Sequence, residues 1–225
     1  MNLLGIDTAT AASAACVLRS DGESFEVAPA PERLLERPAH AAELMPAVHE
    51  AMERAGLAFG ELDAIGVGVG PGSFTGLRIG VSTARALAHG TGAELRPVSS
   101  LRALAAGIDA PVRLPLIDAR RGEVFGALYE GGEERWAPFA TAPEELVERL
   151  REARPPARAA GDGAIRFRYL LEEAGIPVEP AGSSAHVVRG LHLCRLAALA
   201  PARPPEAVVP DYLRQPDAKP TSASS

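Results

Sequence analysis

Residues 66–80 read Gly-Val-Gly-Val-Gly-Pro-Gly-Ser-Phe-Thr-Gly-Leu-Arg-Ile-Gly. The alternating valines and glycines predict an apolar strand, and Ser73 and Thr75 are residue types that begin helices. Gly70 and Gly72 lack a Cβ, so they can take positive φ and let backbone N–H groups approach a ligand closely. A helix N-terminus carries partial positive charge. The stretch therefore favours a phosphate or carboxylate site, and a tight strand-to-helix connection that binds nothing is the other interpretation.

Two better-known glycine signatures fit this stretch less well. A Walker A loop has Lys and then Ser or Thr after its last glycine, whereas Leu77 stands there in this chain, which excludes an ordinary P-loop. The pattern Gly70-x-Gly72-x-x-Thr75 approximates the dinucleotide fingerprint, and Glu94 stands near the expected ribose-binding acid. The pattern lies well inside the chain and follows a hairpin unit, which argues against a dinucleotide-binding domain.

The N-terminal unit predicts strand, turn, strand, turn, strand. The three strands are expected over residues 2–6, 11–18 and 24–27. Asp7, Thr8 and Thr10 stand in the first turn. This order is typical of the actin/Hsp70/sugar-kinase class of ATP-handling folds, in which the first hairpin carries a carboxylate and a hydroxyl to the phosphates. The alternative interpretation is that Asp and Thr only shape the turn.

Several segments together resemble a known family. They are residues 4–10 (LGIDTAT), 40–46 (HAAELMP), 70–80 (GPGSFTGLRIG), 98–101 (VSSL), 118–124 (DARRGEV), 161–163 (GDG) and 212–214 (YLR). Their order and spacing resemble those of the bacterial TsaB (YeaZ) family, whose members help to install threonylcarbamoyladenosine on tRNA. The block over residues 70–76 is the most specific of these segments. The resemblance covers nearly the whole chain, up to about Arg214.

The resemblance implies a fold and a function. The expected fold is α/β, of the actin/Hsp70/sugar-kinase (ribonuclease H-like) type with two subdomains. The implied role is that of a non-catalytic accessory subunit for transfer of the threonylcarbamoyl group to the adenosine beside the anticodon. The expected partners are a TsaD-like catalytic paralogue and a TsaE-like ATPase, and the chain could also form a homodimer. Contact with tRNA is expected only within the complex. A free-standing ATP-dependent small-molecule kinase or ATPase of the same fold is the alternative.

The alternation of strands and helices predicts the domain boundaries. A first domain is expected over residues 1–107, with the hairpin, the glycine-rich loop and the dimerisation surface, and a second α/β domain over residues 108–216. Residues 217–225 consist largely of Pro, Ser and Ala, which bury too little apolar surface to become ordered. A disordered tail is expected there.

A nucleotide site is expected where the hairpin turn and the glycine-rich loop meet. ATP or ADP is the candidate ligand, and no catalytic residue is predicted. The expected binding residues are Asp7, Thr8, Thr10, Gly70, Pro71, Gly72, Ser73, Phe74, Thr75 and Gly76. The sequence leaves open the roles of four residues in the later landmarks, which are Asp118, Asp162, Tyr212 and Arg214.

The metal pattern of the catalytic relatives is incomplete in this chain. Those relatives, the TsaD/Kae1 group, hold a metal with His-x-x-x-His on the first helix, because residues four apart share a helical face. Here His40 is followed four positions later by Leu44, which cannot coordinate a metal. We therefore expect elemental analysis of the purified chain to find no stoichiometric zinc or iron, and we expect no peptidase activity.

Two predicted helices carry candidate partner-binding faces. On the helix after the glycine-rich loop, Gly76, Gly80 and Ala84 recur at intervals of four, and small residues let another backbone approach closely. On the helix that starts near His40, the residues sharing one face are Leu44, Val48 and Met52. The resemblance favours a surface that docks a second kinase-like chain through His40 and these six residues. Packing against the chain's own sheet is the alternative.

Composition sets limits on function. The chain has 225 residues, 47% of them hydrophobic, so it can bury one sizeable core or two small ones. Its formal net charge of −6 argues against a main tRNA-binding surface on this chain alone, since nucleic-acid affinity comes largely from clustered Lys and Arg. Two cysteines, an N-terminus without a basic region and the lack of a long apolar stretch favour the cytoplasm.

Overall fold

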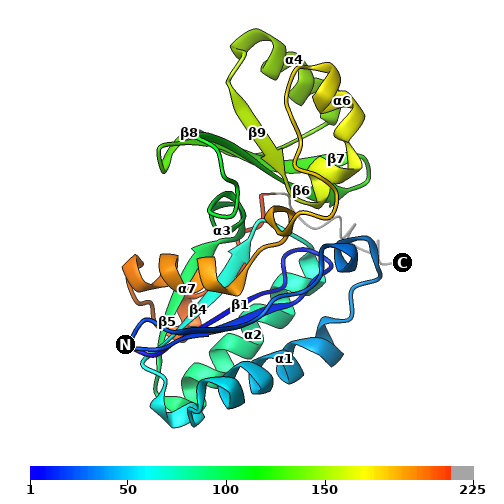
Figure 1. Ribbon diagram of the computed structural model, residues 1–225. Helices are drawn as coiled ribbons and strands as arrows, with labels where there is room; N and C mark the ends of the chain where they lie inside the picture. The colour runs from blue at the N-terminus through cyan, green and yellow to red at the C-terminus, as the bar shows by residue number, and fades with distance from the viewer. Residues whose placement is uncertain (214–225) are drawn as a thin grey trace, which may run out of the picture.

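The computed structural model describes residues 1–213, which form two α/β lobes, one above the other in Figure 1. Arg214 and the predicted disordered tail lie outside the described residues. Each lobe contains one β-sheet, and the helices between the strands make the whole a mixed α/β structure. The predicted two-lobed fold of the actin/Hsp70 class is confirmed.

The first lobe is built on a five-stranded sheet of order β3-β2-β1-β4-β5. Its strands are β1 (Leu3–Asp7), β2 (Ala14–Leu18), β3 (Ser24–Val27), β4 (Ala64–Gly70) and β5 (Glu94–Ser99). β1, β2 and β3 pair antiparallel as the hairpin unit predicted, and β4 and β5 run parallel to β1. The carboxyl ends of β1 and β4 therefore meet at one edge, which brings the first turn beside the glycine-rich loop.

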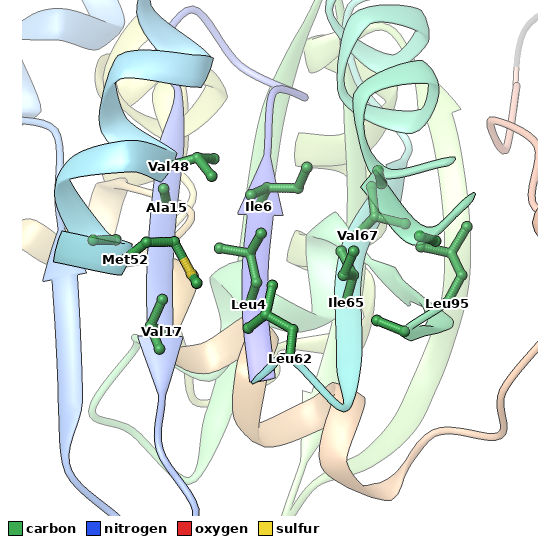
Figure 2. Close-up of a cluster of buried hydrophobic side chains, with 14 of the residues drawn as sticks. Leu4, Ile6, Ala15, Val17, Val48, Met52, Leu62, Ile65, Val67 and Leu95 are labelled. Carbon is green, nitrogen blue, oxygen red and sulfur yellow. The ribbon is translucent and has the colours of Figure 1, made fainter. Parts of the chain in front are cut away.

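Two helices, α1 (His40–Ala55) and α2 (Phe74–Thr91), cover one face of this sheet (Figure 1). Gly56 ends α1 with φ of +65°, and the Ser73 side chain caps α2. Figure 2 shows Val48 and Met52 of α1 against the apolar side chains of β1 and β2. This cluster is the main core of the first lobe, and burial of its apolar surface stabilises the packing of the helices on the sheet.

The opposite face of the first sheet is covered by α7 (Gly190–Leu199), drawn in orange in Figure 1. The helix approaches closely because glycines line the sheet there. A Cβ on Gly5 would lie 2.7 Å from the Gly190 carbonyl oxygen, and one on Gly66 would lie 2.6 Å from the Ala197 Cβ. The chain thus returns to the first lobe near residue 190. The prediction placed residues 108–216, and with them α7, in the second domain. This boundary is wrong for α7, because the helix packs on the sheet of the first lobe.

The second lobe contains a four-stranded sheet of order β8-β7-β6-β9. Its elements are β6 (Val112–Arg120), β7 (Glu123–Glu130), β8 (Glu133–Thr141), α4 (Pro143–Ala153), β9 (Ala157–Ala160), α5 (Asp162–Arg166) and α6 (Arg168–Glu173). The sheet repeats the antiparallel β3-β2-β1 meander and parallel β4 of the first lobe. The two lobes therefore share one strand arrangement.

Between the lobes lies α3 (Ser100–Ala105). Leu101 and Leu104 of α3 pack in one cluster with residues of both sheets and of α7, so the lobes share a buried core. In the described part of the chain there are also four short 3₁₀ helices: η1 (Pro31–Leu35), η2 (Phe59–Glu61), η3 (Ser184–His186) and η4 (Pro205–Ala207). Among residues 1–213, no helix has the length and apolar character needed to cross a bilayer.

Candidate functional site

The Asp7 carboxylate is enclosed by protein groups. Its Oδ2 accepts a hydrogen bond from the Ser100 hydroxyl at 2.6 Å, and its Oδ1 accepts one from the Ala9 backbone N–H at 2.7 Å. Burial raises the pKa of Asp7 to about 6, partly offset by these two hydrogen bonds. A Cβ on Gly68 would lie 1.7 Å from Oδ2, so β4 also closes over the carboxylate.

The two threonines of the same turn also bond within the protein. The Thr8 hydroxyl donates to the Gly76 carbonyl oxygen at 2.7 Å, and the Thr10 hydroxyl accepts from the Ala12 N–H at 3.4 Å. Both side chains are buried. The expected phosphate-binding role of Asp7, Thr8 and Thr10 stays a prediction. In this structure the three side chains bond to α3, α2 and the turn itself, respectively.

The glycine-rich loop lies directly on the hairpin turn. Gly70 has φ of +114°, which L side chains rarely adopt, and its bond to Pro71 is cis. A Cβ on Gly72 would lie 2.5 Å from the Ala9 carbonyl oxygen, and the Ser73 N–H donates to that same oxygen at 2.7 Å. The turn and the loop leave no room for a phosphate between them.

A cleft of about 700 Å³ opens on the other side of the loop, between the lobes. Its size is in the range of small-molecule sites. The first lobe contributes the start of α1 and the loop, and the second lobe contributes the β6–β7 turn. The lining residues used below are His40, Gly72 to Gly76, Ile79, Asp118 to Arg121, Phe125, and Asp211 to Leu213. Of the expected nucleotide-binding residues, Gly72, Ser73, Phe74, Thr75 and Gly76 thus line an open space.

His40 stands at the inner end of this cleft with 3% of its surface exposed. Its Nδ1 lies 2.8 Å from the Ser13 hydroxyl, while Nε2 is buried and has no hydrogen-bond partner among the described residues. Loss of solvent on burial lowers the pKa of His40. The residue is therefore a buried, largely neutral imidazole with one unused nitrogen.

The β6–β7 turn carries Asp118 and two arginines to the opposite wall. Asp118 Oδ2 accepts from Arg166 at 2.9 Å and from Arg120 at 3.3 Å. Arg120 and Arg121 have φ of +64° and +54°, which is uncommon for residues other than glycine. The turn thus holds two consecutive guanidinium-bearing residues beside the cleft.

Asp162 supports this turn from behind. Its Oδ1 accepts from the backbone N–H groups of Asp118 and Gly163, each at 3.0 Å. Burial raises the pKa of Asp162 to about 6. The Gly161-Asp162-Gly163 segment therefore joins β6 to α5, and the carboxylate of Asp162 is not among the residues that line the cleft.

The last described residues close one side of the cleft. The Asp211 N–H donates to the Val69 carbonyl oxygen at 2.7 Å, and Tyr212 stacks on Phe74 with ring centroids 5.1 Å apart. Sequence reasoning left Tyr212 without a role. No local sequence signal predicts that Phe74 and Tyr212, 138 positions apart, stack on each other. The one available signal was an aromatic residue in a polar, Pro-rich segment, which indicates that the segment packs against the rest of the protein.

The predicted partner-binding face is turned inward. Leu44, Val48, Met52 and Ala84 belong to the core of the first lobe, and none is more than 2% exposed. Gly76 and Gly80 face the hairpin turn, where a Cβ on Gly80 would lie 2.3 Å from the Thr8 Oγ1. His40 lines the cleft. The prediction of a docking surface on these residues was wrong, because a stripe of small or apolar side chains also fits a helix that packs on its own sheet.

No cluster of three or more His, Cys, Asp or Glu side chains able to hold a metal occurs within residues 1–213. Leu44, at the position of the second histidine of the metal-binding pattern, lies in the apolar core. The absence of bound zinc and iron stays a prediction for elemental analysis.

Comparisons with known proteins match most of this chain. The family model TsaD, tRNA N6-adenosine threonylcarbamoyltransferase, matches residues 33–219. The uncharacterized protein ML0378 of Mycobacterium leprae is 36% identical over 99% of this chain, which spans 57% of that protein. The tRNA threonylcarbamoyladenosine biosynthesis protein TsaB of Bacillus subtilis is 32% identical over 97% of this chain and 96% of its own length. The solved structure of YeaZ from Pseudomonas aeruginosa superposes with a TM-score of 0.76 at 27% identity, covering 94% of this chain and 100% of that one.

Proposed function

The chain belongs to the TsaB family of tRNA threonylcarbamoyladenosine biosynthesis proteins, and from this premise we propose that it is a non-catalytic accessory subunit in threonylcarbamoyl transfer to tRNA. The observation that carries the proposal is the similarity to Bacillus subtilis TsaB over almost the full length of both chains. The proposed site of action is the cytoplasm, where the adenosine beside the anticodon is modified.

The closed hairpin turn supports an accessory role over the alternative of an independent kinase or ATPase. In an ATP-handling fold of this class the Asp-Thr turn and the glycine-rich loop meet the phosphates. Here the Ser73 N–H donates to Ala9, and Asp7 and Thr8 bond to protein groups. A nucleotide would have to displace these contacts before its phosphates could reach the turn.

We propose a TsaD-like catalytic subunit and a TsaE-like ATPase as the partners. The outer face of α1 and α2 is the proposed docking surface for the catalytic subunit or for a second copy of this chain. On α2, the exposed residues Arg78, Ser82 and Arg85 recur at intervals of four and three. The exposed residues of the whole helix are Phe74, Thr75, Arg78, Ser82, Arg85, Ala86, His89 and Gly90. Contact with tRNA would come through the complex, in keeping with the net charge of −6.

Depleting this protein from its native cell should reduce threonylcarbamoyladenosine in bulk tRNA, measured by mass spectrometry of the digested nucleosides. Expression of the parent chain should restore it. The purified chain should release phosphate from ATP only at the background rate until both partners are added. An unchanged nucleoside level would contradict the proposed function, and steady ATP turnover by the chain alone would favour the kinase or ATPase alternative.

A Ser82→Trp variant should lose association with the TsaD-like partner while its thermal unfolding midpoint stays within about 2 °C of the parent, because substitutions of exposed residues usually change stability by no more than about 0.5 kcal/mol. Ser82 is exposed on the outer face of α2. Glu148→Trp, at an exposed position of α4 in the other lobe, is the matched control. Sedimentation velocity of the mixed proteins measures association, and full assembly of the Ser82→Trp variant would remove this face from the proposed interface.

A further inference from the structure

A second hollow of the first lobe lies on the side of the sheet that α7 covers, and it shares no lining residue with the interlobe cleft. It has a volume of about 370 Å³ and is bordered by β5, α3 and the end of α7 (Figure 1). We call it the α7–β5 groove. The lining residues that matter here are Pro97, Val98, Arg102, Leu196, Leu199 and Pro201. Since most of these side chains are apolar, the groove can receive an apolar side chain.

Leu199 lies at the rim of this groove with 87% of its surface exposed, more than any other large apolar side chain among residues 1–213. Leu196 is three positions earlier on the same side of α7, and Pro201 follows the helix, so both extend the apolar surface around Leu199. An exposed apolar surface with charged side chains around it is typical of a protein-binding site. The groove thus offers contacts on several sides to an apolar side chain of a partner.

The charged residues of the segments that build the groove are of one sign. Residues 96–108 and 190–205 contain four arginines and no Asp or Glu, although the whole chain has a formal net charge of −6. Three of these arginines, Arg102, Arg195 and Arg203, are exposed and form no ion pair within residues 1–213. The surface around the groove is therefore complementary to an acidic partner.

Two acids from neighbouring elements approach the groove without reversing this charge. Glu94 is paired with Arg96, whose guanidinium also donates to the last carbonyl oxygens of α7. Glu134 of β8 lies near the buried Tyr129, whose hydroxyl is hydrogen-bonded to Ser99 of β5. Against the four arginines, these two acids leave a positive balance.

β5 is an edge strand of the first sheet, so pairing with a strand of the partner is one conceivable binding mode. The edge is closed to it. The Arg203 N–H donates to the Leu95 carbonyl oxygen at 2.8 Å, and Pro97 has no N–H to donate. A partner has to bind through side chains, as an amphipathic helix does when its apolar face enters a groove.

We propose that the α7–β5 groove binds an acidic amphipathic helix of a partner protein. The helix places a large apolar side chain beside Leu199 and carboxylates near Arg102, Arg195 and Arg203. Arg195 shares the helical face of Leu199, since it precedes that residue by four positions. α7 and the pair α1 and α2 cover opposite faces of the first sheet, so this site and the docking surface proposed above can be occupied together (Figure 1). Binding at this groove goes beyond the accessory role and does not depend on it.

The test titrates fluorescently labelled synthetic peptides with the full-length chain and measures anisotropy. The first peptide carries leucines at helical spacing with glutamates between them, and the second has lysine in place of every glutamate. We expect saturable binding of the glutamate peptide and binding of the lysine peptide that is weaker by about tenfold or more, because like charges would meet at the three arginines. Equal affinity for both peptides, or no saturation with the glutamate peptide, would overturn the proposal. Single-stranded oligouridine that binds more tightly than the glutamate peptide, and loses binding in Arg102→Gln, would assign the surface to nucleic acid instead.

Two variants with matched controls locate the site. Leu199→Ser should weaken binding of the glutamate peptide by about fivefold or more, while the thermal unfolding midpoint stays within about 2 °C of the parent because the side chain is exposed. Leu35→Ser, at another largely exposed leucine outside the groove, should leave the affinity unchanged. Arg102→Gln should weaken binding and reduce its salt dependence, whereas Arg37→Gln, at an exposed position outside the groove, should do neither. A Leu199→Ser variant that binds like the parent, or an equal loss in variant and control, would refute the site.

Discussion

A Gly80→Leu variant is expected to lose at least about 3 kcal/mol of folding free energy, at the upper end of typical overpacking costs. A Cβ at this position would lie 2.3 Å from the Thr8 Oγ1, which itself donates to the Gly76 carbonyl oxygen. The leucine would therefore push α2 away from the hairpin turn. In a chain of this size the thermal unfolding midpoint should fall by roughly 6–12 °C. Urea unfolding followed by circular dichroism measures the effect.

Gly90→Leu is the matched control for this substitution. Gly90 lies in the same helix, is exposed, and has nothing within 4 Å of the position of a Cβ. Leucine is the better helix former by up to about 1 kcal/mol, so this variant should be as stable as the parent or more stable. If Gly80→Leu melted with the parent but failed to associate with a partner, Gly80 would have to face outward, and the packing described here would be incorrect.

An Asp7→Asn variant is expected to remove a large part of the pH dependence of stability. Burial raises the pKa of Asp7 from 3.8 to about 6 in the folded chain. Because the folded value lies above the unfolded one, the stability from this group is fully present below pH 3.8 and is lost as the pH rises through 6. A shift of this size corresponds to about 3 kcal/mol. Asparagine can still accept from the Ala9 N–H and hydrogen-bond to the Ser100 hydroxyl.

The measurement is the free energy of unfolding in urea at several pH values between 4 and 8. The parent should lose about 3 kcal/mol more than Asp7→Asn over this interval. Asp109→Asn, at an exposed position, should follow the parent curve. Parallel curves for the parent and Asp7→Asn would mean that the carboxylate of Asp7 is solvated, in conflict with its enclosure between the turn, β4 and α3.

The candidate site was only partly accessible from the sequence. The glycine-rich loop and the start of the following helix were predicted correctly, and five of the ten expected nucleotide-binding residues line the cleft. The hairpin residues do not, since the Ala9 carbonyl and the Thr8 hydroxyl bond to the loop itself. Polar residues beside a glycine turn look the same in sequence whether they bind a ligand or each other. The facing wall, at Arg120 and Arg121, comes from a segment more than 40 residues later.

The sequence by itself determined the elements whose signals are local. Ser73 as the cap of the helix after the glycine-rich loop followed from a short-range rule, because a capping group acts within one helical turn. Tertiary structure alone decided β8 and β9. Glu133–Thr141, which begins with three charged residues and contains Pro138, and the alanine-rich Ala157–Ala160 have weak strand propensity and become strands only by pairing with β7 and β6. It also decided that Leu44, Val48 and Gly80 face inward and that α7 returns to the first sheet. Apolar and small side chains specify that a surface is to be buried, and only the assembled fold supplies the surface that buries it.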